Sequence, residues 1–267
     1  MNKTAIHIHN LSVRAGRRSI LSVGDLSIEQ NEFVGILGAN GSGKSTLLRT
    51  CNGMQHHATG QVTVLGLQLA SMGFRRLAAL RRAIGYVPQL LPARGEIPLT
   101  LREVIAIGRT GMAGLLHPLG REDWQLVDQW IDRLGLSSLA GQGYGTVSGG
   151  EQRKTLIAKA MVQEPRILLL DEPTANLDPG WRERIVNIVQ SLHAAGSLTV
   201  VLVCHELEVL PPCCRRVVML DQGMVVADGS PEHVLTVSRI ESVYGPGLSV
   251  WHQGGRHLVV PAEVSRA

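Results

Sequence analysis

The chain has 267 residues, which suits one large α/β domain or two smaller lobes with a sizeable core. Its hydrophobic content of 44% and charged content of 18% are those of a globular rather than a disordered protein. The net charge of +4 is compatible with an anionic ligand or a membrane surface, whereas an aromatic content of 3% leaves few rings to stack on the bases of single-stranded nucleic acid.

The sequence contains no signal for export or for crossing a membrane. The first residues lack the apolar core of a signal peptide, and no run approaches the roughly 20 apolar residues of a membrane span. The four cysteines have no metal-ligand spacing, and two of them, Cys213 and Cys214, are adjacent. We therefore expect a chain with free thiols in a reducing cytosol, soluble unless a partner holds it at a membrane.

Strands and helices alternate along most of the chain. Strands are expected at 6–13, 33–37, 60–66, 84–87, 166–170, 199–203 and 216–220, and helices at 45–51, 74–82 and 181–192. Residues 100–162 read as helices alone, with Trp124, Val127, Ile131 and Leu134 at helical spacing on a core face. The pattern predicts an α/β fold with a mainly parallel sheet and a helical subdomain inserted at about 90–163. The tail at 246–267 has no clear period and no predicted role.

A phosphate-binding loop follows the second of these strands. The segment "GANGSGKST" at 38–46 fits the pattern G-x-x-x-x-G-K-[ST] between a strand and a helix, the context that separates such a loop from a chance glycine-rich turn. Gly41 and Gly43 let several backbone N–H groups point at one phosphate, Lys44 places a positive charge on the β- and γ-phosphates, and Ser45 offers a hydroxyl to Mg²⁺. The predicted nucleotide-binding residues are Gly38, Ala39, Asn40, Gly41, Ser42, Gly43, Lys44, Ser45 and Thr46.

Polar residues close three other strands. Asp171 and Glu172 follow "ILLL", where the first is expected to hold Mg²⁺ and the second to orient or deprotonate a water that attacks the γ-phosphate. Gln89, after "IGYVP", is a candidate to contact Mg²⁺ or that water, and His205, after "TVVLVC", to bond the γ-phosphate. A glutamine or histidine alone at such a place is more often structural, and the joint occurrence favours function.

A second glycine loop, "SGGE" at 148–151, also opens a predicted helix. Backbone N–H groups at a helix start favour anions, but this loop has no lysine and no hydroxyl placed for Mg²⁺. Alone, this loop is therefore too weak to hold a nucleotide.

The ordered set of phosphate loop, glutamine, "SGGE", "LLLDEP", "ANLD" and strand-ending histidine resembles the ATP-binding subunit of ABC transporters over roughly 6–245. The resemblance implies a phosphate-loop ATPase domain at 1–245 with an N-terminal antiparallel β portion, using ATP and Mg²⁺. It implies that two such domains close head-to-tail around two ATP molecules. The residues it assigns are Lys44, Gln89, Glu172 and His205 for catalysis, Ser45, Gln89 and Asp171 for Mg²⁺, Ser148, Gly149, Gly150 and Glu151 as the loop acting on the partner's nucleotide, and Asp178 at the dimer contact.

Two positions depart from the family pattern. Many members stack an aromatic ring on adenine where this chain has Ala15, and the flanking Arg14 is expected to be solvated rather than stacked on the base. We therefore predict similar affinities for ATP and GTP. The second loop is preceded by Val147 where leucine is usual and ends in Glu151 where glutamine is usual, and we expect both changes to be tolerated.

The implied function is ATP hydrolysis that drives transport through separate membrane permease subunits at the cytoplasmic face of the membrane. The segment "LTLREVIAIGRTG", together with "SGGE" and the late "SVYG", resembles importers of metal ions and iron chelates: iron–siderophore, haem, cobalamin, zinc or manganese. Implied partners are a second copy or a homologous ATPase subunit, the permease and, through the complex, a solute-binding protein, with no nucleic acid. The alternative is a non-transport ABC-type ATPase acting on nucleic acid or ribosomes, whose usual long insertions are not visible. A phosphate-loop GTPase or small-molecule kinase would have no use for "SGGE", and the sequence has no N-K-x-D guanine signature.

Overall fold

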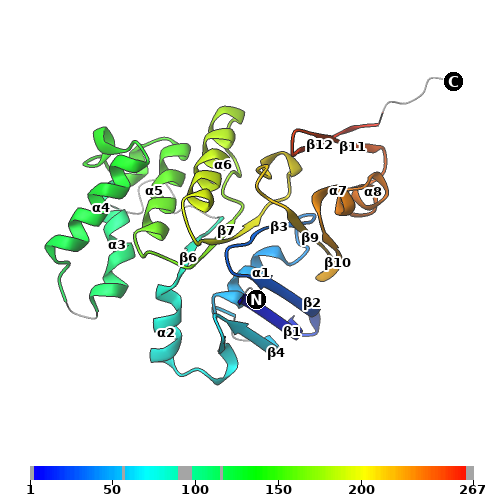
Figure 1. Ribbon diagram of the computed structural model, residues 1–267, viewed down its shortest axis with the longest axis horizontal. Helices are drawn as coiled ribbons and strands as arrows, with labels where there is room; N and C mark the ends of the chain where they lie inside the picture. Colours follow the sequence, from blue (N-terminus) through cyan, green and yellow to red (C-terminus); the bar gives the residue numbers. More distant parts are fainter. Residues whose placement is uncertain (1–2, 56–57, 90–97, 115–116, 263–267) are drawn as a thin grey trace. The chain divides into compact units, whose positions relative to one another are not determined.

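The computed structural model describes residues 3–55, 58–89, 98–114 and 117–262. The chain divides into two compact units. We call Met1–Ser71 with Thr199–Ala267 the N/C lobe, and Met72–Leu198 the central lobe. Figure 1 shows the helices and strands of both lobes.

The N/C lobe is a mixed sheet with the strand order β5-β4-β1-β2-β10-β9-β3-β8. Its strands are β1 (Thr4–Ala15), β2 (Arg18–Glu29), β3 (Phe33–Leu37), β4 (Ala58–Val64), β5 (Leu67–Gln68), β8 (Thr199–Val203), β9 (Arg216–Asp221) and β10 (Met224–Gly229). Its helices are α1 (Lys44–Cys51), α7 (Pro231–Val234) and α8 (Val237–Tyr244), with short 3₁₀ turns at Leu69–Ser71 and Leu207–Val209.

The N-terminal strands form the antiparallel portion that the resemblance implies. β1 pairs with β2 around a tight turn in which Ala15 faces Arg18, and β1 pairs with β4 on its other side. Buried apolar residues alternate with exposed polar ones along β1, so one face of this sheet packs on the core and the other meets solvent. The turn brings the start of β2 to the same end of the sheet as Ala15.

The parallel strands β3, β8 and β9 hold the functional loops. β3 is buried along its whole length and pairs in parallel with β8 on one side and β9 on the other. Burial on both faces explains its purely apolar sequence. Because the carboxyl ends of parallel strands meet at one edge of a sheet, the phosphate loop after β3 and His205 after β8 emerge at the same edge.

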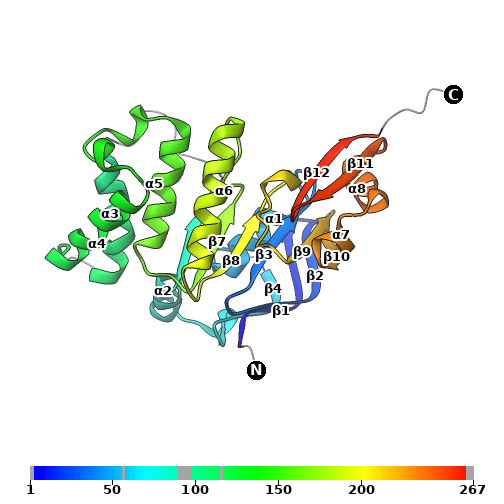
Figure 2. The same ribbon diagram turned by 45° about the horizontal axis from the view of Figure 1, so that its top comes forward.

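The central lobe is mainly helical. Its elements are α2 (Phe74–Arg82), β6 (Ile84–Val87), α3 (Leu101–Ala113), α4 (Arg121–Arg133), α5 (Gly149–Met161), β7 (Ile167–Asp171) and α6 (Pro179–Ala194), with 3₁₀ turns at Ser137–Leu139 and Tyr144–Thr146. Figures 1 and 2 show α3, α4 and α5 packed as neighbours. β6 and β7 pair in parallel, so Gln89 and the pair Asp171 and Glu172 leave this short sheet at one edge.

The tail, in which the sequence analysis found no clear periodicity, contains a two-stranded hairpin of β11 (Leu248–Gln253) and β12 (Arg256–Pro261) beside α8 (Figure 2). The turn residues Gly254 and Gly255 have φ of 59° and 75°, the left-handed conformation that tight hairpin turns require. His252 and His257 face each other across the strands, with 2.7 Å between their Nδ1 atoms. Residues 263–267 lie outside the described part of the chain.

The predicted α/β fold is confirmed, as a mixed sheet. β3, α2 and β6 have the predicted limits, and the stretch after residue 100 is helical as expected. The predicted start of the helical subdomain, near residue 90, lies outside the described residues. β2, β10, α7, α8 and the hairpin are additions that the sequence had not indicated.

Candidate functional site

The phosphate loop has the backbone conformation that its glycines allow. Gly41 and Gly43 have φ of 81° and 99°, values at which any other L-residue is strained. Gly43 is also closely packed, since a Cβ there would lie 3.0 Å from the Ile20 carbonyl oxygen and 3.1 Å from Leu21 Cδ1. The loop therefore keeps its shape through both chain geometry and contact with β2.

Two buried polar groups in this loop suit an anionic ligand. Lys44 is 4% exposed and donates hydrogen bonds to the carbonyl oxygens of Gly38 at 2.8 Å and Ala39 at 2.9 Å. Ser42 is 3% exposed, and within the described residues its Oγ has no hydrogen-bond partner. A buried ammonium and an unsatisfied buried hydroxyl are both stabilised by phosphate oxygens, which supports the predicted role of the loop.

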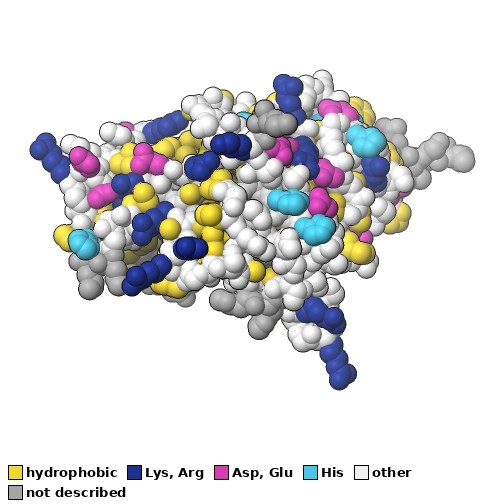
Figure 3. All heavy atoms as spheres, turned by 60° about the horizontal axis from the view of Figure 1, so that its bottom comes forward, with side chains coloured by type: hydrophobic (Ala, Val, Ile, Leu, Met, Phe, Trp, Pro, Cys, Tyr) yellow, Lys and Arg dark blue, Asp and Glu magenta, His cyan; other side chains and the backbone are white. Residues whose placement is uncertain are grey.

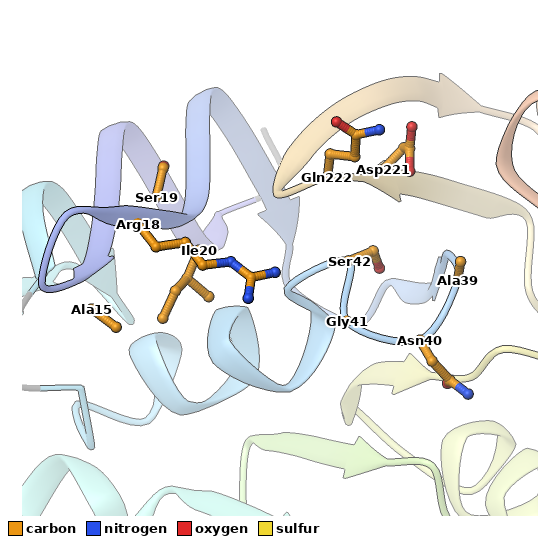
Figure 4. A pocket seen from close by; sticks show the side chains of 10 residues that line it. All are labelled: Ala15, Arg18, Ser19, Ile20, Ala39, Asn40, Gly41, Ser42, Asp221 and Gln222. Carbon is orange, nitrogen blue, oxygen red and sulfur yellow. The ribbon is translucent and has the colours of Figure 1, made fainter.

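A pocket of about 690 Å³ opens beside the loop (Figure 4). Its walls come from three segments of the N/C lobe: the β1–β2 turn, the phosphate loop and the β9–β10 turn. The lining residues are Ala15, Arg18, Ser19, Ile20, Ala39, Asn40, Gly41, Ser42, Asp221 and Gln222. The size is that of sites that hold small organic ligands.

His205 follows β8, as predicted, and is half-buried. Its Nε2 lies 3.7 Å from Glu206 Oε1. The neighbouring carboxylate gives the imidazole a local acidic partner.

In the central lobe the structure brings Gln89 and the acidic pair together. Gln89 Nε2 donates a 2.7 Å hydrogen bond to Glu172 Oε2, and the Tyr86 hydroxyl donates a 3.2 Å bond to Asp171 Oδ2. Glu172 has φ of 48°, a left-handed conformation that non-glycine residues adopt rarely and that is concentrated at functional sites. The two carboxylates are thus held in fixed orientations by side chains from the β6 segment.

Arg153, which the sequence analysis did not single out, holds the Gln89 segment in place. Its side chain is buried, and its guanidinium donates to the carbonyl oxygens of Pro88 at 2.8 Å and Gln89 at 3.4 Å. Burial lowers the pKa of Arg153, while the charges of Asp171 and Glu172 act in the opposite direction. No local sequence signal reveals this residue, because its partners lie more than 60 positions away.

The second glycine loop is a well-formed helix start. Ser148 caps α5: the Glu151 N–H donates to Ser148 Oγ at 3.3 Å, and the Ser148 N–H donates to Glu151 Oε2 at 2.8 Å. Through this reciprocal capping box, the carboxylate of Glu151, which stands where glutamine is usual, has a structural role at the start of α5. Gly150 packs against Trp181, whose ring would lie 2.0 Å from a Cβ at that position.

Asp178, predicted at a dimer contact, caps α6. Its Oδ1 accepts a 3.0 Å hydrogen bond from the Trp181 N–H. The cap therefore orients the same tryptophan that packs on Gly150, which links the "ANLD" segment to the second glycine loop.

The basic stretch of α2 is exposed. Arg75, Arg76 and Arg82 face solvent, and Phe74 is 83% exposed. On the face shown in Figure 3, basic side chains are interspersed with hydrophobic ones. Within the described ranges, no helix combines the length and apolar character needed to span a membrane.

The sequence of this chain is similar to those of known ATP-binding proteins of ABC transporters. A profile of the ABC transporter family matches residues 21–175. A hemin import ATP-binding protein of Bordetella avium is 34% identical, with 90% of this chain and 92% of that protein covered. A methionine import ATP-binding protein of Caulobacter vibrioides is 36% identical, covering 82% and 64%, and a phosphonates import ATP-binding protein of Rhizobium meliloti is 30% identical, covering 97% and 94%.

Two solved structures are similar in fold. An inward-facing metal-chelate type ABC transporter matches with a TM-score of 0.81 at 22% identity, covering 97% of this chain and 98% of that one. The cbiO1 protein from Clostridium perfringens, part of the ABC transporter complex cbiONQ, matches with a TM-score of 0.74 at 25% identity, covering 90% and 94%.

Proposed function

The chain belongs to the ABC transporter family as an ATP-hydrolysing, ATP-binding domain, and from this we propose that it energises the import of a metal ion or metal chelate. The observation that carries the ATPase assignment is the strand–loop–helix with the buried Lys44 and the unsatisfied Ser42 hydroxyl. Import is supported by the hemin, methionine and phosphonates relatives, all of which are import ATP-binding proteins. The metal-chelate class is supported by the hemin relative alone.

We propose that the phosphate loop binds the nucleotide and positions it for attack by water. Lys44 exchanges its two carbonyl partners for the β- and γ-phosphate oxygens, and the N–H groups from Gly41 to Thr46 hold the same phosphates. His205 contacts the γ-phosphate. Since Lys44 is already buried and held by two hydrogen bonds, binding requires little further ordering of its side chain.

The acidic pair supplies the base and a metal ligand. Glu172 accepts the proton of the attacking water, and the Gln89 amide fixes its carboxylate. The oxygens of Ser45, Asp171 and Gln89 are the donor type that Mg²⁺ prefers, and they are the residues that would hold it. Bound Mg²⁺ would supply charge neutralisation at the phosphates.

We propose that the second glycine loop acts on the nucleotide of a second copy or a homologous subunit. The start of α5 presents Ser148, Gly149 and Gly150. The capping box occupies the Ser148 hydroxyl with Glu151, so engaging a phosphate requires that hydroxyl to turn away from the carboxylate. The loop alone would bind a phosphate weakly, because it has no cation equivalent to Lys44. Asp178 is connected to it by Trp181, which hydrogen-bonds to Asp178 through its N–H and packs on Gly150 through its ring.

Membrane permease subunits are the proposed mechanical partners, with the ATPase on the cytoplasmic face and a solute-binding protein joined through the complex. The surface proposed for the permease begins at Gln89, and the residues that follow it, 90–97, lie outside the described part of the chain. Closure of two ATPase subunits around ATP would move the permease helices, because ATP has higher affinity for the closed state.

The test is complementation of a strain that lacks the gene. The strain should lose uptake of a metal ion or chelate such as hemin, and the wild-type gene should restore it. Lys44→Ala should not restore uptake, whereas the matched variant Lys3→Ala, at an exposed N-terminal lysine, should. Normal metal uptake with lost use of phosphonate or methionine would reject the metal class but keep the ATPase assignment. Full uptake by Lys44→Ala would reject the assignment.

A further inference from the structure

The pocket beside the phosphate loop is larger than phosphates alone require. Its volume is about 690 Å³, and it extends from Ser42 in the loop to Ala15 and Arg18 at the β1–β2 turn. If the phosphates lie on the loop, the remaining space receives the sugar and base attached to them. The inference that this space receives a nucleobase rests on the proposed function.

No aromatic ring lines this pocket among the described residues. Ala15 offers a single methyl group and Ile20 an aliphatic surface. A base bound here therefore has no ring on which to stack, and another planar group is needed to cover its face.

Arg18 has the position and the freedom to do so. Figure 4 shows its guanidinium extending from the start of β2 toward the phosphate loop, with Ile20 beside it. Within the described residues, nothing accepts a hydrogen bond from this guanidinium. Arg14 differs, because it donates a 3.2 Å bond to the Arg17 carbonyl oxygen and does not line the pocket.

We propose that the Arg18 guanidinium lies over the face of the nucleobase and takes the place of a stacking ring. A guanidinium is planar and attracted to the π face of an aromatic system. Because every purine presents such a face, the contact adds affinity without distinguishing adenine from guanine. Arg18 is thus a determinant of base affinity, and it gives the predicted similarity of ATP and GTP binding a physical cause.

Calorimetric titration of the full chain with ATP, GTP and tripolyphosphate separates a base contact from a phosphate contact. For Arg18→Ala we expect ATP and GTP to bind roughly 5- to 30-fold more weakly, the range for a cation–π contact between exposed and desolvated. Tripolyphosphate should bind as it does to wild type. Arg18→Tyr should restore ATP affinity by supplying a ring, and the matched variant Arg14→Ala should leave all three affinities unchanged.

Several results would overturn the proposal. Unchanged ATP affinity in Arg18→Ala would remove Arg18 from the base site. An equal loss of ATP and tripolyphosphate binding, restored by Arg18→Lys, would show that the guanidinium acts on phosphate instead. If wild type bound neither ATP nor tripolyphosphate, the nucleotide function itself would fail. Thermal melts of each variant show whether a loss of binding reflects misfolding. If Arg18→Ala is misfolded, the nucleotide affinities of Arg18→Tyr, which retains a planar side chain, are compared with wild type instead.

Discussion

Replacing Gly150 by alanine should disturb the second glycine loop through one contact. The added Cβ would lie 2.0 Å from Trp181 Cδ2 and 2.3 Å from Cε3. Carbon atoms in contact are about 3.5–4.0 Å apart, so the ring or the helix start must move by about 1.5 Å. The ring is also held by cations, with Lys154 Nζ 5.5 Å and Arg184 Cζ 4.9 Å from its centroid.

The expected cost is that of overpacking, about 1–3 kcal/mol, partly offset by the roughly 1 kcal/mol gained on replacing a helical glycine. The net loss is about 0–2 kcal/mol, so at about 2–4 °C per kcal/mol for a protein of nearly this size Gly150→Ala should melt up to about 8 °C below wild type. It should melt about 2–12 °C below Gly149→Ala, which gains the same helix propensity without the clash. Circular dichroism melting measures the shift. Gly149→Ala is the matched control, because its Cβ would lie 3.4 Å from Leu177 Cδ2, an ordinary contact.

The double variant Gly150→Ala with Trp181→Leu should relieve the clash, so its melting temperature should fall no further than that of Trp181→Leu alone. The reasoning fails if Gly150→Ala melts as high as Gly149→Ala while tryptophan fluorescence stays unchanged.

Two further changes act at other places. Arg153→Met leaves the Pro88 and Gln89 carbonyl oxygens without their hydrogen-bond donor. Urea denaturation should show a free energy of unfolding about 1–3 kcal/mol lower than that of wild type, and steady-state assays should show a lower kcat. Wild-type values for both quantities would contradict the positioning role of Arg153. In the hairpin, burial and then the charge of His252 lower the pKa of His257 below its ordinary 6.5. A lowered pKa in the folded state means that the stabilisation is complete above pH 6.5 and is lost as pH falls through the folded value. The protection factors of the hairpin amides, which correct each exchange rate for its intrinsic dependence on pH, should therefore be lower at pH 5 than at pH 8. His257→Phe should abolish this difference, and equal protection factors at the two pH values in wild type would refute this reasoning.

Elements with a clear pattern of hydrophobic residues were predictable from the sequence. β3 is a run of apolar residues between glycines and polar residues, and its burial on both faces matches that pattern. The phosphate loop was predictable because its residues are contiguous and its conformation depends on local glycines. The same holds for Asp171 and Glu172, whose orientation follows from where β7 ends.

The features that the sequence analysis missed went unpredicted for two reasons. The C-terminal hairpin carries a usable signal, since Gly254 and Gly255 lie between short runs of alternating residues, and a two-residue glycine turn is typical of hairpins. Arg153 and Trp181 carry no such signal, because their contacts join segments far apart in the chain. Arg18 became a candidate for the base site only when folding placed it in the pocket wall.

The most direct test of the account is the turnover of Glu172→Gln. The new amide keeps an oxygen that can accept the Gln89 hydrogen bond, so the geometry is retained while the base is removed. ATP binding should persist, an ATP-bound dimer should accumulate in size-exclusion chromatography, and hydrolysis should fall by about 100-fold or more. Glu122→Gln, on the exposed start of α4, should behave as wild type. Wild-type hydrolysis by Glu172→Gln would contradict the central claim that this carboxylate activates the attacking water.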